Sequence, residues 1–406
     1  MKITQKSESE FIIVMASLMA LVALSIDALL PAISEINKEL QITNPKNSQL
    51  FITMIFLGLG FGQLISGPLS DGLGRKPIIY SGFIVFVCAS LICVFATNLE
   101  MMILGRFLQG VGLSAPRTVS IAMVRDRFSG NYMAKIMSFI VVIFILVPVI
   151  APALGKLMLD LYGWKSIFYS QLLFGFFTMI WVWKRQPETL KIANRKKIKF
   201  SLFIEGVQEF TKHKTAIIFT LFSGFITGSF MVYLSASQQI FEEQYHLKNE
   251  FPLIFAGLAI SIGFATFLNG KLVIKHGMFK LVSISTISFT LIPIIYIFLF
   301  SGENNPNITV LILFFGLQFF SIGFLFGNTR ALAMEPIGHI AGIGAAINGF
   351  TSTIMAVPIA TCIGAYITNT ALPLFVGFFI CGIISLLLIG FLYFTNKKEM
   401  ARLNSK

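Results

Sequence analysis

The chain has 406 residues, of which 56% are hydrophobic and only 12% are charged, and its mean hydropathy is +0.83. A soluble protein of this length needs a charged exterior, so the composition excludes an ordinary soluble domain and indicates a polytopic membrane protein. The formal net charge of +13 is compatible with nucleic-acid binding, but the basic residues gather in the loops on one side of the predicted membrane spans, which indicates a topology signal and no nucleic-acid partner.

The hydrophobic runs are continuous, and each is long enough to cross a bilayer as a helix, which takes about 20 apolar residues. Backbone inside a membrane must satisfy its own hydrogen bonds, and runs of this length do so as helices and not as barrel strands. No cleavable signal peptide is expected, because the first run is too long and no small-residue cleavage site follows it. The predicted spans are residues 11–36, 48–70, 77–97, 100–124, 134–159, 164–184, 214–241, 251–274, 280–300, 307–333, 340–368 and 371–395.

Asp27 is the only acid that the pattern places well inside a span, somewhat past the middle of the first run. An ionised carboxylate is costly there. Burial favours its neutral form and a nearby cation favours its ionised form, so the balance can let it load and release a proton near neutral pH. A fixed ion pair that never titrates is the alternative.

A short charged turn with several glycines separates the second and third runs. Acidic and basic side chains at a membrane boundary suggest a gating element, although any cytoplasmic hairpin tends to be basic. The gating candidates in this turn are Gly67, Asp71, Gly74, Arg75 and Lys76.

The fourth run carries two arginines, Arg106 and Arg117, eleven residues apart and therefore on one helix face. Gln109 and Ser114 lie on or near the same face. Arginine does not lose its proton, so this face is expected to point into a cavity or toward an acid. Arg117, Gln109 and Ser114 are candidate substrate contacts, with packing of Arg117 on backbone carbonyls as the alternative.

The fifth run contains Pro148, Pro152 and Gly155. Proline bends a helix and small residues allow close helix packing, so these three are assigned to packing.

The longest polar break follows the sixth run, and within it apolar residues recur at helical spacing. This pattern predicts a short amphipathic helix lying on the inner leaflet, with a regulatory partner site as the alternative. The predicted organisation is a first bundle at 1–184, a cytoplasmic linker at 185–213, a second bundle at 214–395 and a basic tail at 396–406.

The two halves resemble each other. Gly67 and Gly74 recur as Gly270 and Gly277 at one constant offset, whereas Arg75 corresponds to Met278. Both halves therefore keep the glycines of the turn, but only the first half keeps its charged residues.

Polar candidates in the second half are neutral and can bind a substrate or hold helices together. They are Tyr233, Gln238, Gln318, Asn328 and Asn348. The four cysteines lie within spans and the four histidines lie near loops, so no disulfide, metal or catalytic set is expected.

Several of these segments resemble the major facilitator superfamily. The 67–76 turn resembles its signature between helices 2 and 3, with Gly72 in place of the usual arginine, and residues 104–110 resemble its helix 4 motif. The stretch around Pro152 resembles the antiporter motif of helix 5, with strict matches only at Pro152 and Gly155.

Further strings, including Pro187-Glu188-Thr189-Leu190, resemble the bicyclomycin/chloramphenicol-resistance (Bcr/CflA) branch of twelve-helix drug:proton antiporters. The resemblance implies an all-α fold of two pseudo-symmetric six-helix bundles around a central cavity. It also implies that Asp27 and Arg106 form a proton-coupling pair, and that Asp71, Arg75 and Arg125 form a cytoplasmic latch.

The resulting expectation is a monomeric exporter in the inner membrane of a bacterium, with both termini in the cytoplasm. The protein is not expected to be an enzyme. No nucleotide-binding motif is present, so the energy source is the proton gradient and no cofactor is expected. The expected cargo is an amphenicol-like drug or a neutral, zwitterionic or anionic metabolite or siderophore. The alternatives are a proton-coupled importer of a nutrient or metal chelate and, more distantly, a membrane receptor.

Overall fold

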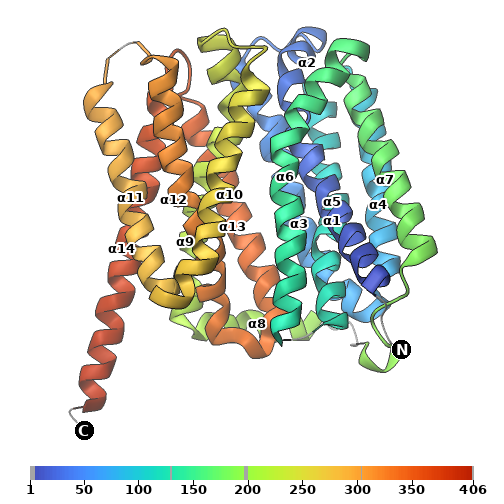
Figure 1. The fold of residues 1–406 in the computed structure, drawn as a ribbon, viewed down its shortest axis with the longest axis vertical. Coiled ribbons are helices and arrows are strands. Elements are labelled where there is room, and N and C mark those ends of the chain that lie inside the picture. Colours follow the sequence, from blue (N-terminus) through green and yellow to red (C-terminus); the bar gives the residue numbers. More distant parts are fainter. Residues whose placement is uncertain (1–4, 129, 196–199, 303, 405–406) are drawn as a thin grey trace. The chain divides into compact units, whose positions relative to one another are not determined.

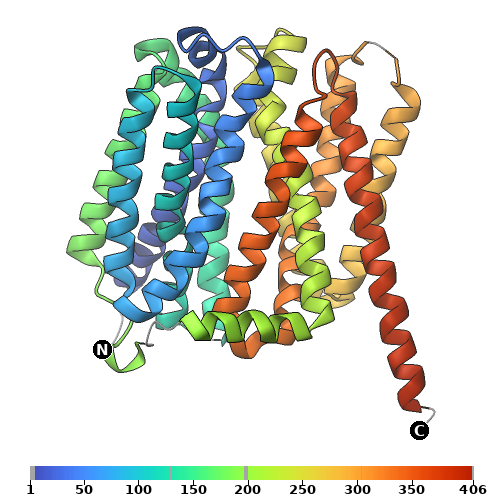
Figure 2. The same ribbon diagram turned by 180° about the vertical axis from the view of Figure 1, so that it is seen from behind.

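The computed structural model describes residues 5–128, 130–195, 200–302 and 304–404, and within these ranges the regular structure is entirely helical. Each of the twelve predicted runs falls on one long helix or on one helix with a break (Figures 1 and 2). The predicted fold class is therefore confirmed. It follows from the continuous apolar runs, whose backbone groups are satisfied within each helix.

The described chain forms two compact units. Unit 1 holds residues 1–199 and 237–259, and unit 2 holds residues 200–236 and 260–406. The helices of the first half are α1 (Gln5–Asp27), η1 (Leu30–Ala32), α2 (Ile33–Glu39), α3 (Pro45–Leu73), α4 (Arg75–Val94), α5 (Leu99–Arg127), α6 (Gly130–Tyr162), α7 (Lys165–Arg185) and η2 (Ile192–Asn194). Those of the second half are α8 (Phe200–Lys212), α9 (Lys214–Gln238), η3 (Gln239–Gln244), α10 (Phe251–His276), α11 (Met278–Leu299), α12 (Ile308–Met334), η4 (Glu335–Ile340), α13 (Ala341–Gly364) and α14 (Leu372–Asn404).

These units differ from the predicted organisation in two places. The linker helix α8 belongs to unit 2, and residues 237–259, predicted as part of the second bundle, belong to unit 1. The reason for the second difference is contact across the sequence: Gln238 and Lys248 bond to side chains of α2.

Ten of the described helical segments are long and apolar enough to cross a membrane by composition. α5 is not among them although it has 29 residues, since it carries Arg106, Arg117 and four further charged residues. A helix with this many charges is stable within a membrane only when its polar face is buried in protein or faces water.

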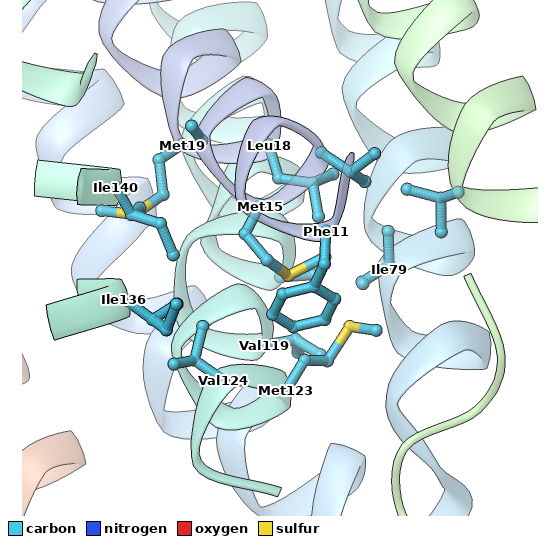
Figure 3. Close-up of a cluster of buried hydrophobic side chains, with 14 of the residues drawn as sticks. Phe11, Met15, Leu18, Met19, Ile79, Val119, Met123, Val124, Ile136 and Ile140 are labelled. Atoms are coloured by element: carbon cyan, nitrogen blue, oxygen red, sulfur yellow. The ribbon is translucent and has the colours of Figure 1, made fainter. Parts of the chain in front are cut away.

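The core of unit 1 is formed where α1 crosses α4, α5 and α6. Phe11 and Met15 of α1 pack against Ile79 of α4 and against Val119 and Met123 of α5 (Figure 3). Arg127 places its guanidinium 4.7 Å from the centre of the Phe11 ring, so the start of α1 is fixed against the end of α5.

Unit 2 is packed largely through aromatic rings, which accounts for many of the 43 phenylalanines. Tyr296 of α11 stacks on Phe375 of α14 with centroids 3.6 Å apart, and Phe319 of α12 meets Tyr233 of α9 edge-on at 4.5 Å. The predicted substrate candidate Tyr233 is thus part of a buried aromatic cluster.

The predicted amphipathic helix is present as α8. Its Phe210 is buried against Ala216 and Ile337, and Gly206 lies directly against Ile343 of α13. Part of the apolar face therefore packs on unit 2, whereas Ile204 remains exposed.

Candidate functional site

The first transmembrane segment is broken at the acid that the sequence singled out. α1 ends at Asp27, and a turn and the 3-10 helix η1 precede α2. Pro31 has no amide hydrogen and cannot bond to the carbonyl of Asp27 four residues earlier, so the α-helix cannot continue there. The break places the Asp27 carboxyl beside irregular backbone within the span, which a membrane protein tolerates only inside protein or along a water-filled path.

α6 packs directly against this break. A Cβ atom added at Gly155 would lie 1.9 Å from the carbonyl oxygen of Ala28, so only glycine permits the contact. Pro152 is buried one turn earlier and Pro148 is half-buried. Gly155 therefore holds α6 against the residue that follows Asp27.

The Asp27 carboxyl is 5% exposed. Within the described residues this carboxyl forms no ion pair, either with Arg106 or with any other cation. The expected pair of Asp27 and Arg106 is therefore not formed in this structure. A buried carboxylate without a cation is strongly disfavoured in its ionised form.

Arg106 is fully buried and is held by oxygens of three other residues. Its Nε donates to the carbonyl of Phe51 at 2.9 Å, and its Nη1 donates to the carbonyl of Ser25 at 2.9 Å and to Oε1 of Gln109 at 2.8 Å. Its Nη2 has no hydrogen-bond partner within the described chain. Arg106 thus ties α5 to α3 and to α1, and its contact on α1 is at Ser25, two residues before Asp27. Its Nη2 group remains an unused hydrogen-bond donor.

Gln109 and Ser114, the predicted substrate contacts, are both buried and hydrogen-bonded to neighbouring helices in this structure. Gln109 is fully buried between Arg106 and the hydroxyl of Ser90, to which it donates at 2.8 Å. The Ser114 and Ser66 hydroxyls share a 2.8 Å hydrogen bond where α3 and α5 meet. The hydrogen bonds of both side chains therefore join α5 to neighbouring helices in this structure. Arg117, about three turns further along the same face of α5 than Arg106, is half-buried.

Most of the predicted turn at 67–76 is helical in the structure. Only Gly74 lies between the end of α3 and the start of α4. Gly74 has φ of +110°, and its counterpart Gly277 between α10 and α11 has φ of +78°. This left-handed region strains any residue with a Cβ, so both halves need glycine at the same point. The internal repeat seen in the sequence is thereby explained at these two positions. At Gly67 the nearest atom to an added Cβ is 3.8 Å away, so packing does not require glycine there.

Arg75 joins two helix ends. Its Nη1 donates to Oδ1 of Asp71 at 2.6 Å and to the hydroxyl of Ser70 at 2.8 Å. Its Nε and Nη2 donate to the two oxygens of Asp126 at 2.8 and 3.1 Å. The bidentate pair with Asp126 fixes the end of α5 to the start of α4.

Glu188 completes this network from the segment after α7. Its carboxylate accepts from the backbone amides of Arg75 and Lys76, each at 3.0 Å, and so caps the N-terminus of α4. The Lys76 ammonium donates to the carbonyl of Gln186 at 2.7 Å, which ties α4 to the end of α7. Thr189 donates to Asp126 at 2.8 Å.

The expected partner of Asp71 was Arg125, and here the structure differs. Arg125 is exposed and makes no ion pair within the described residues, whereas Asp71 pairs with Arg75. The side chain of α5 that reaches this network is that of the next residue, Asp126, which pairs with Arg75, because helical periodicity turns neighbouring side chains about 100° apart.

The polar candidates of the second half mostly join helices. Gln318 donates to the carbonyl of Phe289 at 3.1 Å, Asn348 to Thr220 at 2.8 Å, and Asn328 to Asn269 at 2.6 Å. All three are buried. Gln238 lies in unit 1 and bonds to Ser34 and Glu242.

Sequence reasoning missed Asp126, Glu188 and Glu242 as site residues. Asp126 and Glu188 stand in strings that carry the family resemblance, so the signal was present but unassigned. Glu242 lies at the end of a predicted span, where an acid is ordinarily solvated.

Comparison with known proteins places these features in a family. Residues 15–360 match the family described as the Major Facilitator Superfamily. The chain is 28% identical over 403 residues to a bicyclomycin resistance protein homolog of Haemophilus influenzae, covering 97% of this chain and 99% of that one. It is 29% identical over 390 residues to the uncharacterized MFS-type transporter YdgK of Bacillus subtilis, covering 94% of each. It is 26% identical over 395 residues to the multidrug resistance protein MdtL of Salmonella paratyphi A, covering 93% and 94%.

Solved structures agree on the fold. The xylose transporter XylE from E. coli, in a partially occluded inward open conformation, gives a TM-score of 0.71 at 11% identity, covering 96% of this chain and 98% of that one. The human organic anion transporter MFSD10 gives 0.66 at 15% identity, covering 94% and 98%. At these identities the likeness concerns the fold alone.

Proposed function

Because the chain belongs to the Major Facilitator Superfamily and is a multi-pass membrane transporter, we propose that it exchanges protons for a small amphiphilic molecule and exports that molecule. The observation that carries the proposal is Asp27, a buried carboxyl without a cation at a break in α1. The printed names of two relatives, a bicyclomycin resistance protein homolog and a multidrug resistance protein, support export of a drug-like cargo.

The proposed coupling uses the cost of an unpaired buried charge. With Asp27 protonated, the break in α1 is neutral and can remain closed in protein. Loss of the proton leaves a carboxylate that must be met by water, by cargo or by the unused Nη2 donor of Arg106. Proton and cargo thereby compete for one site, which is the requirement for exchange.

The proposed cargo is neutral, zwitterionic or anionic, for example an amphenicol or a carboxylate-bearing metabolite or siderophore. Arg106 and Arg117 keep positive charge on α5 whether or not Asp27 is ionised. The side of α5 that carries these two arginines therefore offers a lipophilic cation no electrostatic attraction.

The proposed location is the inner membrane with both termini in the cytoplasm. The supporting observation is the concentration of lysine and arginine in the segments that would then face inward, including Arg75, Lys76, Arg125 and Arg127. The start of α1 lies at the same end of unit 1 as the end of α7, because Glu10 pairs with Arg185 at 2.7 Å.

The network of Arg75 with Asp71, Asp126 and Glu188 is proposed as the cytoplasmic gating element. It ties the ends of α3, α4 and α5 and the segment after α7 within unit 1. We propose that it makes this end of unit 1 move as one body during alternating access.

Inside-out vesicles test both direction and coupling. An exporter should accumulate radiolabelled chloramphenicol or bicyclomycin when the lumen is acidic, and collapse of the pH gradient with nigericin should release it. Accumulation that persists after the gradient is collapsed would contradict proton coupling. Gradient-driven loss of cargo from the lumen would instead indicate an importer.

A further inference from the structure

A second buried acid, Glu242, lies far from Asp27 in the sequence. It belongs to η3, a π-helical turn that ends α9, and its side chain is 8% exposed. π-helical turns are rare and often coincide with functional positions. η3 is part of unit 1, so its contacts with α2 and α3 lie within one compact unit.

Glu242 is the centre of a small polar cluster, defined by Ser34, Gln238 and Glu242. Its Oε2 accepts from the Ser34 hydroxyl at 3.2 Å and from Nε2 of Gln238 at 3.0 Å. Nε2 of Gln238 also donates to Ser34. Its Oε1 is buried and has no hydrogen-bond partner within the described chain.

The nearest cation, Lys248, attracts this carboxyl electrostatically but forms its ion pair with Glu35 and not with Glu242. On α2 the charged neighbours are Glu35 and Lys38, and Glu35 pairs with Lys248 at 3.1 Å. On η3 itself the neighbour is Glu243, whose carboxylate also accepts a hydrogen bond from Gln238, and the following segment adds Tyr245 and His246. Glu242 forms no ion pair with any of these cations.

The neighbouring side chain on α3 is neutral. Gln49 donates to Gln239 at 3.2 Å, so a hydrogen bond between two amides joins η3 to α3. An ionised carboxylate would therefore be buried there with one unpartnered oxygen and no ion pair, whereas a protonated carboxyl would fit without an uncompensated charge.

We propose that Glu242 is a second proton-binding residue, and that its protonation is required for the cluster with Ser34 and Gln238 to close. The proposal deepens the proposed proton-coupled function and rests on it for its role in transport. When residues 237–259 move away from α2, water reaches the carboxylate. A proton from that water binds Glu242, changes its charge from minus one to zero, and is released to the same side when the cluster opens again.

The consequence is a gate that responds to pH at one end of unit 1. The proposed orientation places this end outside the cell. A low pH on that side would favour closure of this end after the transporter has released its cargo. Exchange of cargo against inward-moving protons requires this order of events. Asp27 would carry the coupled proton, and Glu242 would set when this end shuts.

The test measures the distance between two spin labels in purified full-length protein in lipid nanodiscs, as pH is varied. Cys88, Cys93, Cys362 and Cys381 are first replaced by alanine or serine. The labels are placed at Thr97→Cys, between α4 and α5, and at Asn249→Cys, in the 237–259 segment that is proposed to move; both residues are exposed and belong to unit 1.

The background protein should show a short-distance population that grows as the pH falls. Glu242→Gln cannot ionise and should keep the short distance at every pH. Glu242→Met, which has a similar length and no charge, serves the same purpose if the glutamine variant does not fold. Glu243→Gln and His246→Gln remove the neighbouring titratable groups and should leave the pH response unchanged.

A background protein without any pH response would overturn the proposal. So would a Glu242→Gln variant that responds to pH as the background protein does, or a His246→Gln variant that loses the response. The measurement needs no cargo and no proton gradient. If Asp27→Asn transports normally while the distance still depends on Glu242, the proposed coupling fails and the gate stands.

Discussion

At the scale of single residues, the site depends on close contacts that composition cannot reveal. Arg106 is held by two backbone carbonyls and one amide, and not by the acid at similar linear depth. Linear depth along a helix gives height in the membrane but not the direction of a side chain. The sequence singled out Asp27 on α1 and Arg106 on α5, and the pair expected between them is not formed in this structure.

Gly155 provides a stability test at this scale. A Cβ at residue 155 would overlap the Ala28 carbonyl oxygen at 1.9 Å, and backbone cannot move aside as a flexible side chain can. We expect Gly155→Ala to lower the free energy of unfolding by about 1–3 kcal/mol. Reversible unfolding in sodium dodecyl sulfate mixtures measures this value.

Gly327→Ala is the matched control, because no heavy atom lies within 4 Å of a Cβ at that helical position. It should leave stability unchanged or raise it slightly, since alanine favours helix over glycine. Equal losses in the two variants would show that α6 does not press on the α1 break.

At the scale of elements, the helices were predictable and the ties between them were not. Each apolar run became a helix, and the single-residue turns at Gly74 and Gly277 follow from one repeated glycine. Asp71 was expected to meet Arg125, but it pairs with Arg75, and the α5 residue in this network is the adjacent Asp126, because only the helix phase decides which of the two neighbours faces α4. Glu188 was missed because its role is to cap a helix more than a hundred residues earlier.

Glu188→Ala tests the cap of α4. Loss of the carboxylate leaves the amides of Arg75 and Lys76 without their side-chain acceptor, and we expect a stability loss of about 1–2 kcal/mol. Glu205→Ala removes an exposed acid on α8 and should stay within about 0.5 kcal/mol of the parent. Comparable stability of both variants in the same unfolding assay would remove Glu188 from the network.

Phe210→Ala tests where the apolar face of α8 rests. If Phe210 packs on Ala216 and Ile337, its truncation should cost about 3 kcal/mol or more. The exposed Ile204 should tolerate alanine with a loss below about 1 kcal/mol. A face that rests on lipid alone would give small losses for both variants, with a reduced affinity for vesicles instead.

At the scale of the whole molecule, the two compact units are both helical but differ in the polar groups that they carry. The charged turn network, the broken helix and both buried acids belong to unit 1. The described polar candidates of unit 2 join its own helices, and its core is largely aromatic. The family could be predicted because motif residues stand at fixed spacing, whereas cargo leaves no such pattern in the sequence.

The central claim is that Asp27 couples proton movement to cargo movement. The most direct measurement compares gradient-driven accumulation with energy-independent exchange of labelled chloramphenicol in vesicles containing Asp27→Asn, with Asp160→Asn as the exposed-acid control. Asp27→Asn should lose accumulation and keep exchange, while Asp160→Asn should keep both. Accumulation by Asp27→Asn at the parental level would contradict this claim.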